Sequence, residues 1–163
     1  MATGYPVVNV SPNNPVFDLP IYVARDEGLF ERAGIEVRFQ AKYSQRNSSD
    51  KEAFSRLKES LFEQGKADVY NLCEWAGIDR SERSSRGAQV LAPGLSAEQR
   101  SAYLGAIDEA ADRIMADFGR YKHYVTEQTR GRLAPHEMSD HFVRYTHYVV
   151  YDQKRFDLSL IHI

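Results

Sequence analysis

Two short polar segments carry the side chains best suited to binding a small molecule without covalent chemistry. The first combines amide and hydroxyl groups, which can donate hydrogen bonds, with an aromatic ring that would form an apolar wall. Its candidate residues are Asn9, Ser11, Asn13, Asn14 and Phe17. The same residue types are common in turns, so the pattern also leaves a purely structural role open.

The second segment is shorter and contains one acidic and one large aromatic side chain. Its candidates are Asn71, Glu74 and Trp75. If Glu74 faces a ligand, it favours a cationic or amine-bearing one, whereas at the start of a helix it would simply complement the helix dipole. Trp75 fits a ligand wall and an ordinary core position equally well.

Residues for covalent or metal chemistry are sparse. Cys73 is the only cysteine, which excludes an internal disulfide and a multi-cysteine metal site, and no histidine lies near it in the sequence to act as a base. His136 and His141 are five residues apart, so they do not share one helical face as the histidines of H-E-x-x-H do. We therefore expect no catalytic residue, no metal and no cofactor, and we leave open how His123 and His147 group with the other two in space.

The composition is that of a globular domain. The 163 residues include 21 Lys and Arg against 23 Asp and Glu, and this balance gives no basic surface for nucleic acid. No segment approaches the run of about 20 apolar residues that a membrane helix needs. Residues 1–10 lack the basic region of a signal peptide. The chain as written is therefore expected in the cytoplasm, or in the periplasm or on a lipid anchor if a leader is missing.

Alternating strand and helix patterns in residues 1–92 predict the elements that position the two polar segments. The expected strands are 5–10, 35–39, 68–72 and 89–92, with helical patterns between them. This alternation predicts a parallel sheet with flanking helices. Because ligands of such sheets bind beyond the carboxyl ends of the strands, the loops at 9–17 and 71–75 are the expected site. The helix N-termini that follow them suit an anion.

Residues 93–157 have a different, helical character. Ser96 and Gln99 have the spacing of a capping box, and apolar residues at helical spacing continue from Tyr103 through Met115 and Phe118 towards Val125. A further helix is expected after Pro135, with Met138 on its apolar face, and it belongs to the same helical region. Residues 158–163 resemble translated adapter sequence and form an unreliable tail.

Three segments resemble a known family. Residues 19–39 read LPIYVARDEGLFERAGIEVRF, residues 62–70 read FEQGKADVY and residues 86–91 read RGAQVL. In this order they resemble the first helix, the second strand, the G-x-A-D-V entry to the third strand and the fourth strand of substrate-binding proteins of ABC transporters. The family is the nitrate, sulfonate and thiamine-precursor type, and the resemblance covers about residues 5–92. The helical pattern at residues 95–118 is similar to the C-terminal helices of the same family.

The resemblance implies a fold and a function. The fold would be one periplasmic-binding-protein-like lobe with a helical C-terminal part, shortened by loss of most of the second lobe. The function would be capture of a small anionic ligand, such as a sulfonate, nitrate or pyrimidine precursor, with an ABC permease as partner if the protein is exported. A homodimer is left open.

The alternative is a cytoplasmic enzyme on the same scaffold, similar to thiamine-pyrimidine synthases, desulfinases or decarboxylases. The first two carry cysteine motifs that this chain lacks, since Cys73 stands alone. We therefore favour the binding protein.

Overall fold

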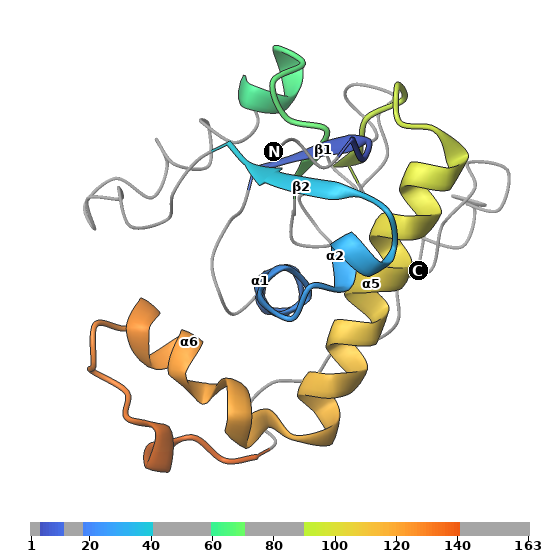
Figure 1. Ribbon diagram of the computed structural model, residues 1–163. Helices are drawn as coiled ribbons and strands as arrows, with labels where there is room; N and C mark the ends of the chain where they lie inside the picture. The colour runs from blue at the N-terminus through green and yellow to red at the C-terminus, as the bar shows by residue number, and fades with distance from the viewer. Residues whose placement is uncertain (1–3, 12–17, 41–59, 71–89, 141–163) are drawn as a thin grey trace, which may run out of the picture.

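The computed structural model describes residues 4–11, 18–40, 60–70 and 90–140 (Figure 1). Short strands and helices alternate in the first half, and helices follow in the second. The strands are β1 (Val7–Ser11), β2 (Glu36–Phe39), β3 (Val69–Tyr70) and β4 (Val90–Leu91). The helices are α1 (Leu19–Asp26), α2 (Leu29–Arg32), α5 (Ala97–Ala116) and α6 (Lys122–Gln128), with 3-10 turns η2 (Phe118–Tyr121) and η3 (Pro135–Glu137). Residues 60–63 are also helical.

The strands form one sheet in the order β2-β1-β3-β4. Strand β1 pairs in parallel with β2 on one side and with β3 on the other, as the alternating pattern predicts. The expectation of an entirely parallel sheet is wrong for β4, which runs antiparallel to β3. Alternation of strands and helices does not encode direction for a pair as short as Val69–Tyr70 and Val90–Leu91, because each strand offers only two residues to the ladder.

The two faces of the sheet are covered differently. Val8 and Val10 are completely buried and belong to one apolar cluster with residues of α1 and α5. Figure 1 shows α1 and α2 on one side of the sheet. Since strand side chains alternate between faces, Asn9 and Ser11 point to the opposite face. On that face Phe62 packs against Tyr70, with ring centroids 5.1 Å apart. The sheet therefore lies between a large helical layer and a smaller one.

Two glycines set the path from α1 to β2. Gly28 and Gly34 have φ angles of 67° and 78°, a backbone region that residues with a Cβ rarely adopt. The first separates α1 from α2, and the second ends α2 and turns the chain into the sheet. No atom lies within 4 Å of a Cβ built on Gly34, so its requirement for glycine comes from the backbone alone.

The helical half departs from its expected pattern in three places. The helix that carries the predicted row of apolar residues is interrupted at Asp117, whose non-helical backbone (φ −149°) ends α5 and leads into η2. Met115 is 40% exposed, so its place in the apolar stripe is wrong. Met138 is buried in the core but has an extended backbone, so the helix predicted after Pro135 is only the short turn η3 within the described residues. The helical pattern predicted beyond residue 140 lies outside the described residues.

The apolar core does not divide at residue 92. Residues of the sheet and of α1, such as Val10 and Ile21, form one buried cluster with Tyr103, Ile107 and Ile114 of α5. The described part of the chain contains no helix long and apolar enough to cross a membrane. The fold is thus a mixed α/β arrangement in which α5 packs against α1 and α2 and shares one buried core with a small sheet.

Candidate functional site

The register of the sheet brings the carboxyl ends of β1 and β3 together. Ser11, the last residue of β1, is paired with Tyr70, the last residue of β3. On the other side, Val10 is paired with Phe39 at the end of β2. We call this edge of the sheet, where Ser11, Tyr70 and Phe39 end their strands, the carboxyl edge. The first polar segment predicted from the sequence includes Ser11, and the second follows Tyr70 in the sequence and lies outside the described residues.

Ser11 has the most unusual environment of the candidate residues that the structure describes. Its side chain points to the same face of β1 as that of Asn9, opposite to Val8 and Val10, and the residue is only 1% exposed. Its Oγ has no hydrogen-bond partner among the described residues. A buried hydroxyl without a partner destabilises a folded protein, because it has given up its hydrogen bonds to water. Ser11 is therefore a position at which an additional hydrogen-bonding group would be favourable.

Asn9 is engaged with neighbouring strands on both sides of β1. Its Nδ2 donates to Oδ2 of Asp68 at 2.9 Å, and its Oδ1 accepts from Nε2 of Gln40 at 2.8 Å. Its backbone N–H donates to the same Oδ2 of Asp68 at 2.8 Å. The side chain predicted to contact a ligand is thus held within the sheet.

Asp68 and Gln40 were not predicted as site residues. Asp68 belongs to the G-x-A-D-V segment, which identifies the entry to β3 but does not indicate that its carboxylate bonds Asn9. Gln40 follows β2 and has no motif around it. The partners lie 59 and 31 residues from Asn9 in the sequence. Only a prediction of strand order and register would have brought them together.

The other candidate residues lie outside the described residues. These are Asn13, Asn14, Phe17, Asn71, Glu74 and Trp75. The same holds for Cys73, His141, His147 and His162. The two histidines that the structure describes are on the helical side, where Nδ1 of His123 lies 3.0 Å from the carbonyl oxygen of Arg120 and His136 is in η3. No group of three or more potential metal ligands occurs in the described parts of the chain.

A cluster of charged side chains lies at the C-terminal end of α1. Glu27 accepts hydrogen bonds from Arg113 and, at 2.8 Å, from the hydroxyl of Tyr121, and Arg120 lies 3.0 Å away. Burial alone would raise the pKa of Glu27, but these donors outweigh it and hold the pKa below its ordinary value. All of these partners are residues of the helical half. The cluster therefore joins the end of α1 to α5 and η2.

The neighbouring carboxylate has a parallel role. Asp26 accepts hydrogen bonds from Arg25 and from the hydroxyl of Tyr124. Burial opposes ionisation of Asp26, yet the two donors keep its pKa below the ordinary value. Burial and the bond to Asp26 together raise the pKa of the Tyr124 phenol. Two consecutive acidic residues thus each receive a tyrosine hydroxyl from the segment that contains η2 and α6.

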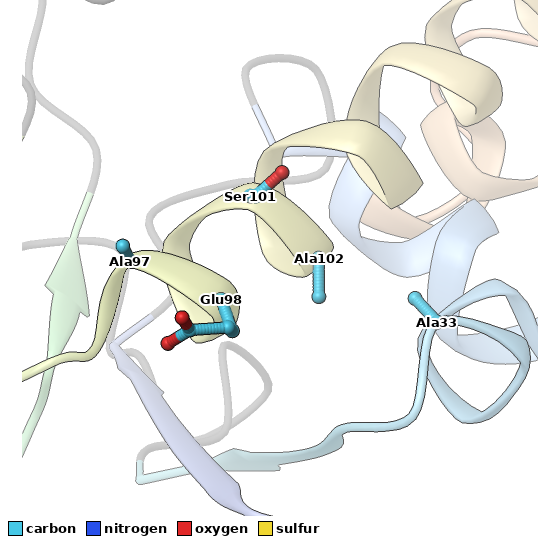
Figure 2. Close-up of a pocket in the computed structure, with 5 residues that line it drawn as sticks. All are labelled: Ala33, Ala97, Glu98, Ser101 and Ala102. Carbon is cyan, nitrogen blue, oxygen red and sulfur yellow. The ribbon is translucent and has the colours of Figure 1, made fainter.

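A shallow hollow of about 600 Å³ lies at the start of α5 (Figure 2). Ala33 and Ala102 stand on either side of it, and Ala97, Glu98 and Ser101 complete its lining. Its location is opposite to the carboxyl edge, because Gln99 in the same turn of α5 donates to the carbonyl of Val7 at the beginning of β1. An alanine-lined hollow with one exposed carboxylate gives little basis for specific binding.

Comparisons with known proteins do not identify a relative. No family model, no curated protein and no solved structure matches the chain. The class of the protein must therefore be argued from its own residues.

Proposed function

We propose that the chain is a solute-binding protein, or part of one, that captures a small anionic ligand at the carboxyl edge for an ABC importer. The observation that carries this proposal is the buried, unpartnered Oγ of Ser11 at the end of a central parallel strand. A hydroxyl at this position can donate to a sulfonate, nitrate or carboxylate oxygen. The three parallel strands and the glycine turns at 28 and 34 support one periplasmic-binding-protein-like lobe.

Binding of this kind is non-covalent. The ligand would gain hydrogen bonds at the carboxyl edge, and any closure of the protein would be driven by tighter binding in the closed state. No described side chain is assigned a catalytic role. The importer's permease is the expected partner of the loaded protein.

The first test is a ligand screen on the purified chain. Nitrate, short alkyl sulfonates and pyrimidines are added separately, and the melting temperature is measured together with size exclusion. A ligand that binds only the folded state raises the melting temperature, and the stabilisation grows with the logarithm of its concentration relative to Kd. A discrete, folded species that responds to none of these probes would contradict the proposal.

Ser11→Ala provides the sharper test, with Thr126→Val as its matched control. Oγ1 of Thr126 is also buried without a hydrogen-bond partner among the described residues, but it lies in α6, away from the carboxyl edge. Neither substitution removes a described hydrogen bond, so neither should lower the melting temperature of the free protein. Only Ser11→Ala should weaken binding of the responding anion, by about ten-fold or more for one lost bond to a charged group. Equal affinities in the two variants would show that Ser11 does not contact the ligand.

A further inference from the structure

The third strand is held to the sheet by unusually few backbone pairs. Strands β1 and β3 share only two paired positions, Val10 with Val69 and Ser11 with Tyr70. Strand β4 adds only two more on the other side of β3. Because a strand this short has few ladder hydrogen bonds, its alignment at the carboxyl edge depends on additional contacts.

Asp68 supplies these contacts one residue before β3 begins. Its backbone N–H donates to the carbonyl of Asn9 at 2.7 Å, and its own carbonyl accepts from the N–H of Ala92 at 2.7 Å. Its Oδ2 accepts from both the backbone N–H and the Nδ2 of Asn9. Asp68 therefore extends the pairing of β1 with β3 by one position and also joins the strand pair to β4.

Gln40 makes the corresponding connection to β2. Its backbone N–H donates to the carbonyl of Val10 at 2.9 Å, and its Nε2 donates to Oδ1 of Asn9. The amide of Asn9 is thus bonded at both ends. An ionised Asp68 can only accept, so the amide orientation of Asn9 is fixed by its partners. Turning Asn9 towards a ligand would break both side-chain bonds.

We infer that Asp68, Asn9 and Gln40 form a positioning chain that aligns Ser11 and Tyr70 at the carboxyl edge, and that Asn9 acts through this chain and not as a ligand contact. The inference rests on the proposed function for the role of the carboxyl edge. The positioning chain itself consists of hydrogen bonds within the sheet. Its central residue, Asn9, precedes Ser11 by two residues in β1.

Two substitutions at Asp68 separate position from charge. Asp68→Asn removes the charge but keeps an oxygen that can accept both bonds from Asn9. Asp68→Ala removes the acceptor and leaves two donors of Asn9 without it. Glu31→Ala removes an exposed carboxylate of α2, away from the sheet, and is the matched control for charge.

The first measurement needs no ligand. Amide hydrogen exchange is compared at Gln40 and Ala92, whose N–H groups are bonded on either side of the positioning chain and are not altered by the substitutions. Asp68→Ala should accelerate exchange at both amides by about ten-fold relative to the buried Ile107 of α5, while Asp68→Asn and Glu31→Ala should not. Unchanged exchange in Asp68→Ala would overturn the positioning chain.

The second measurement uses the anion that raises the melting temperature most in the screen. Its Kd, corrected for the folded fraction, should rise about ten-fold or more in Asp68→Ala and return close to the wild-type value in Asp68→Asn. A Kd that stays raised in Asp68→Asn would show that the carboxylate of Asp68 acts through its charge. An unchanged Kd in Asp68→Ala despite a lower melting temperature would show a merely structural role. If the wild-type protein binds none of the probes, the proposed function fails. The hydrogen-exchange measurement then still decides whether the positioning chain aligns the strands.

Discussion

Glu27 shows how much one side chain can connect in this fold. Its carboxylate is only 12% exposed and receives Arg113 from α5 together with Arg120 and Tyr121 from η2. Its backbone carbonyl accepts from Arg32 of α2. A buried carboxylate is stable in a protein when donors of this kind replace its hydration. Glu27 thus links α1 to three elements that follow it.

Replacing Glu27 by Gln should lower the free energy of unfolding by about 1 to 3 kcal/mol at pH 7, the value of hydrogen bonds to a charged group. The pKa of Glu27 is lowered by folding, so its charge stabilises the fold above its ordinary pKa. That stabilisation is lost as the pH falls through the lower, folded-state pKa. The difference between wild type and Glu27→Gln in urea unfolding should therefore shrink below about pH 4.5.

Glu109→Gln is the control for this experiment. Glu109 also bonds Arg113, at 2.6 Å, but its side chain is 49% exposed, so water can replace the lost interaction. Glu109→Gln should therefore change the free energy of unfolding much less than Glu27→Gln at every pH. Equal effects of the two substitutions would mean that burial of Glu27 does not matter.

At the scale of elements, the start of α5 is the best test of a local prediction. The capping box expected from Ser96 and Gln99 is confirmed, since Oγ of Ser96 accepts from the N–H of Gln99 at 3.1 Å and the Gln99 side chain accepts from the N–H of Ser96 at 2.9 Å. Ser96→Ala should cost about 1 kcal/mol in denaturant unfolding. Ser101→Ala, an exposed substitution one turn later, should be neutral or slightly stabilising because alanine favours helix. A loss in both variants would point to the helix surface instead of the cap.

Local signals of this kind predict elements well and their relations poorly. Period-two and helical patterns predicted β1, β2, α1 and α5. The direction of β4 and the break at Asp117 were not predicted, because neither leaves a local pattern. The apolar stripe of α5 runs into Phe118 and Tyr121, which stay buried although η2 has replaced the helix.

The candidate site divides in the same way. The position of the carboxyl edge follows from the alternation of strands and helices, and Ser11 was among the predicted residues. The roles of Asp68 and Gln40 could not be predicted, because their bonds to Asn9 depend on strand register across 59 and 31 residues of sequence. A side chain whose chemistry and location suit ligand binding can therefore be engaged in hydrogen bonds within the sheet, as Asn9 is.

At the scale of the whole molecule, the sheet and the helical half share one core. Phe30 of α2 stacks on Tyr103 of α5, with ring centroids 5.5 Å apart and planes 9° apart. Val8 and Val10 of the sheet belong to the same buried cluster as Ile107 and Ile114 of α5. A chain that ended at residue 92 would expose the apolar surface of α1 and α2 that α5 covers.

A fragment of residues 1–92 should therefore fail to fold alone. Uncovering several large apolar side chains costs about 1.5 to 3 kcal/mol for each, which together exceeds the stability of a typical domain. We expect no cooperative thermal transition in circular dichroism and no protected amides at Val8 and Val10. Adding a separate fragment of residues 93–163 should restore both, because it returns α5 to the apolar surface of α1 and α2. A stable, monomeric 1–92 fragment with protected sheet amides would show instead that the α/β half is an independent domain and that α5 only rests on it.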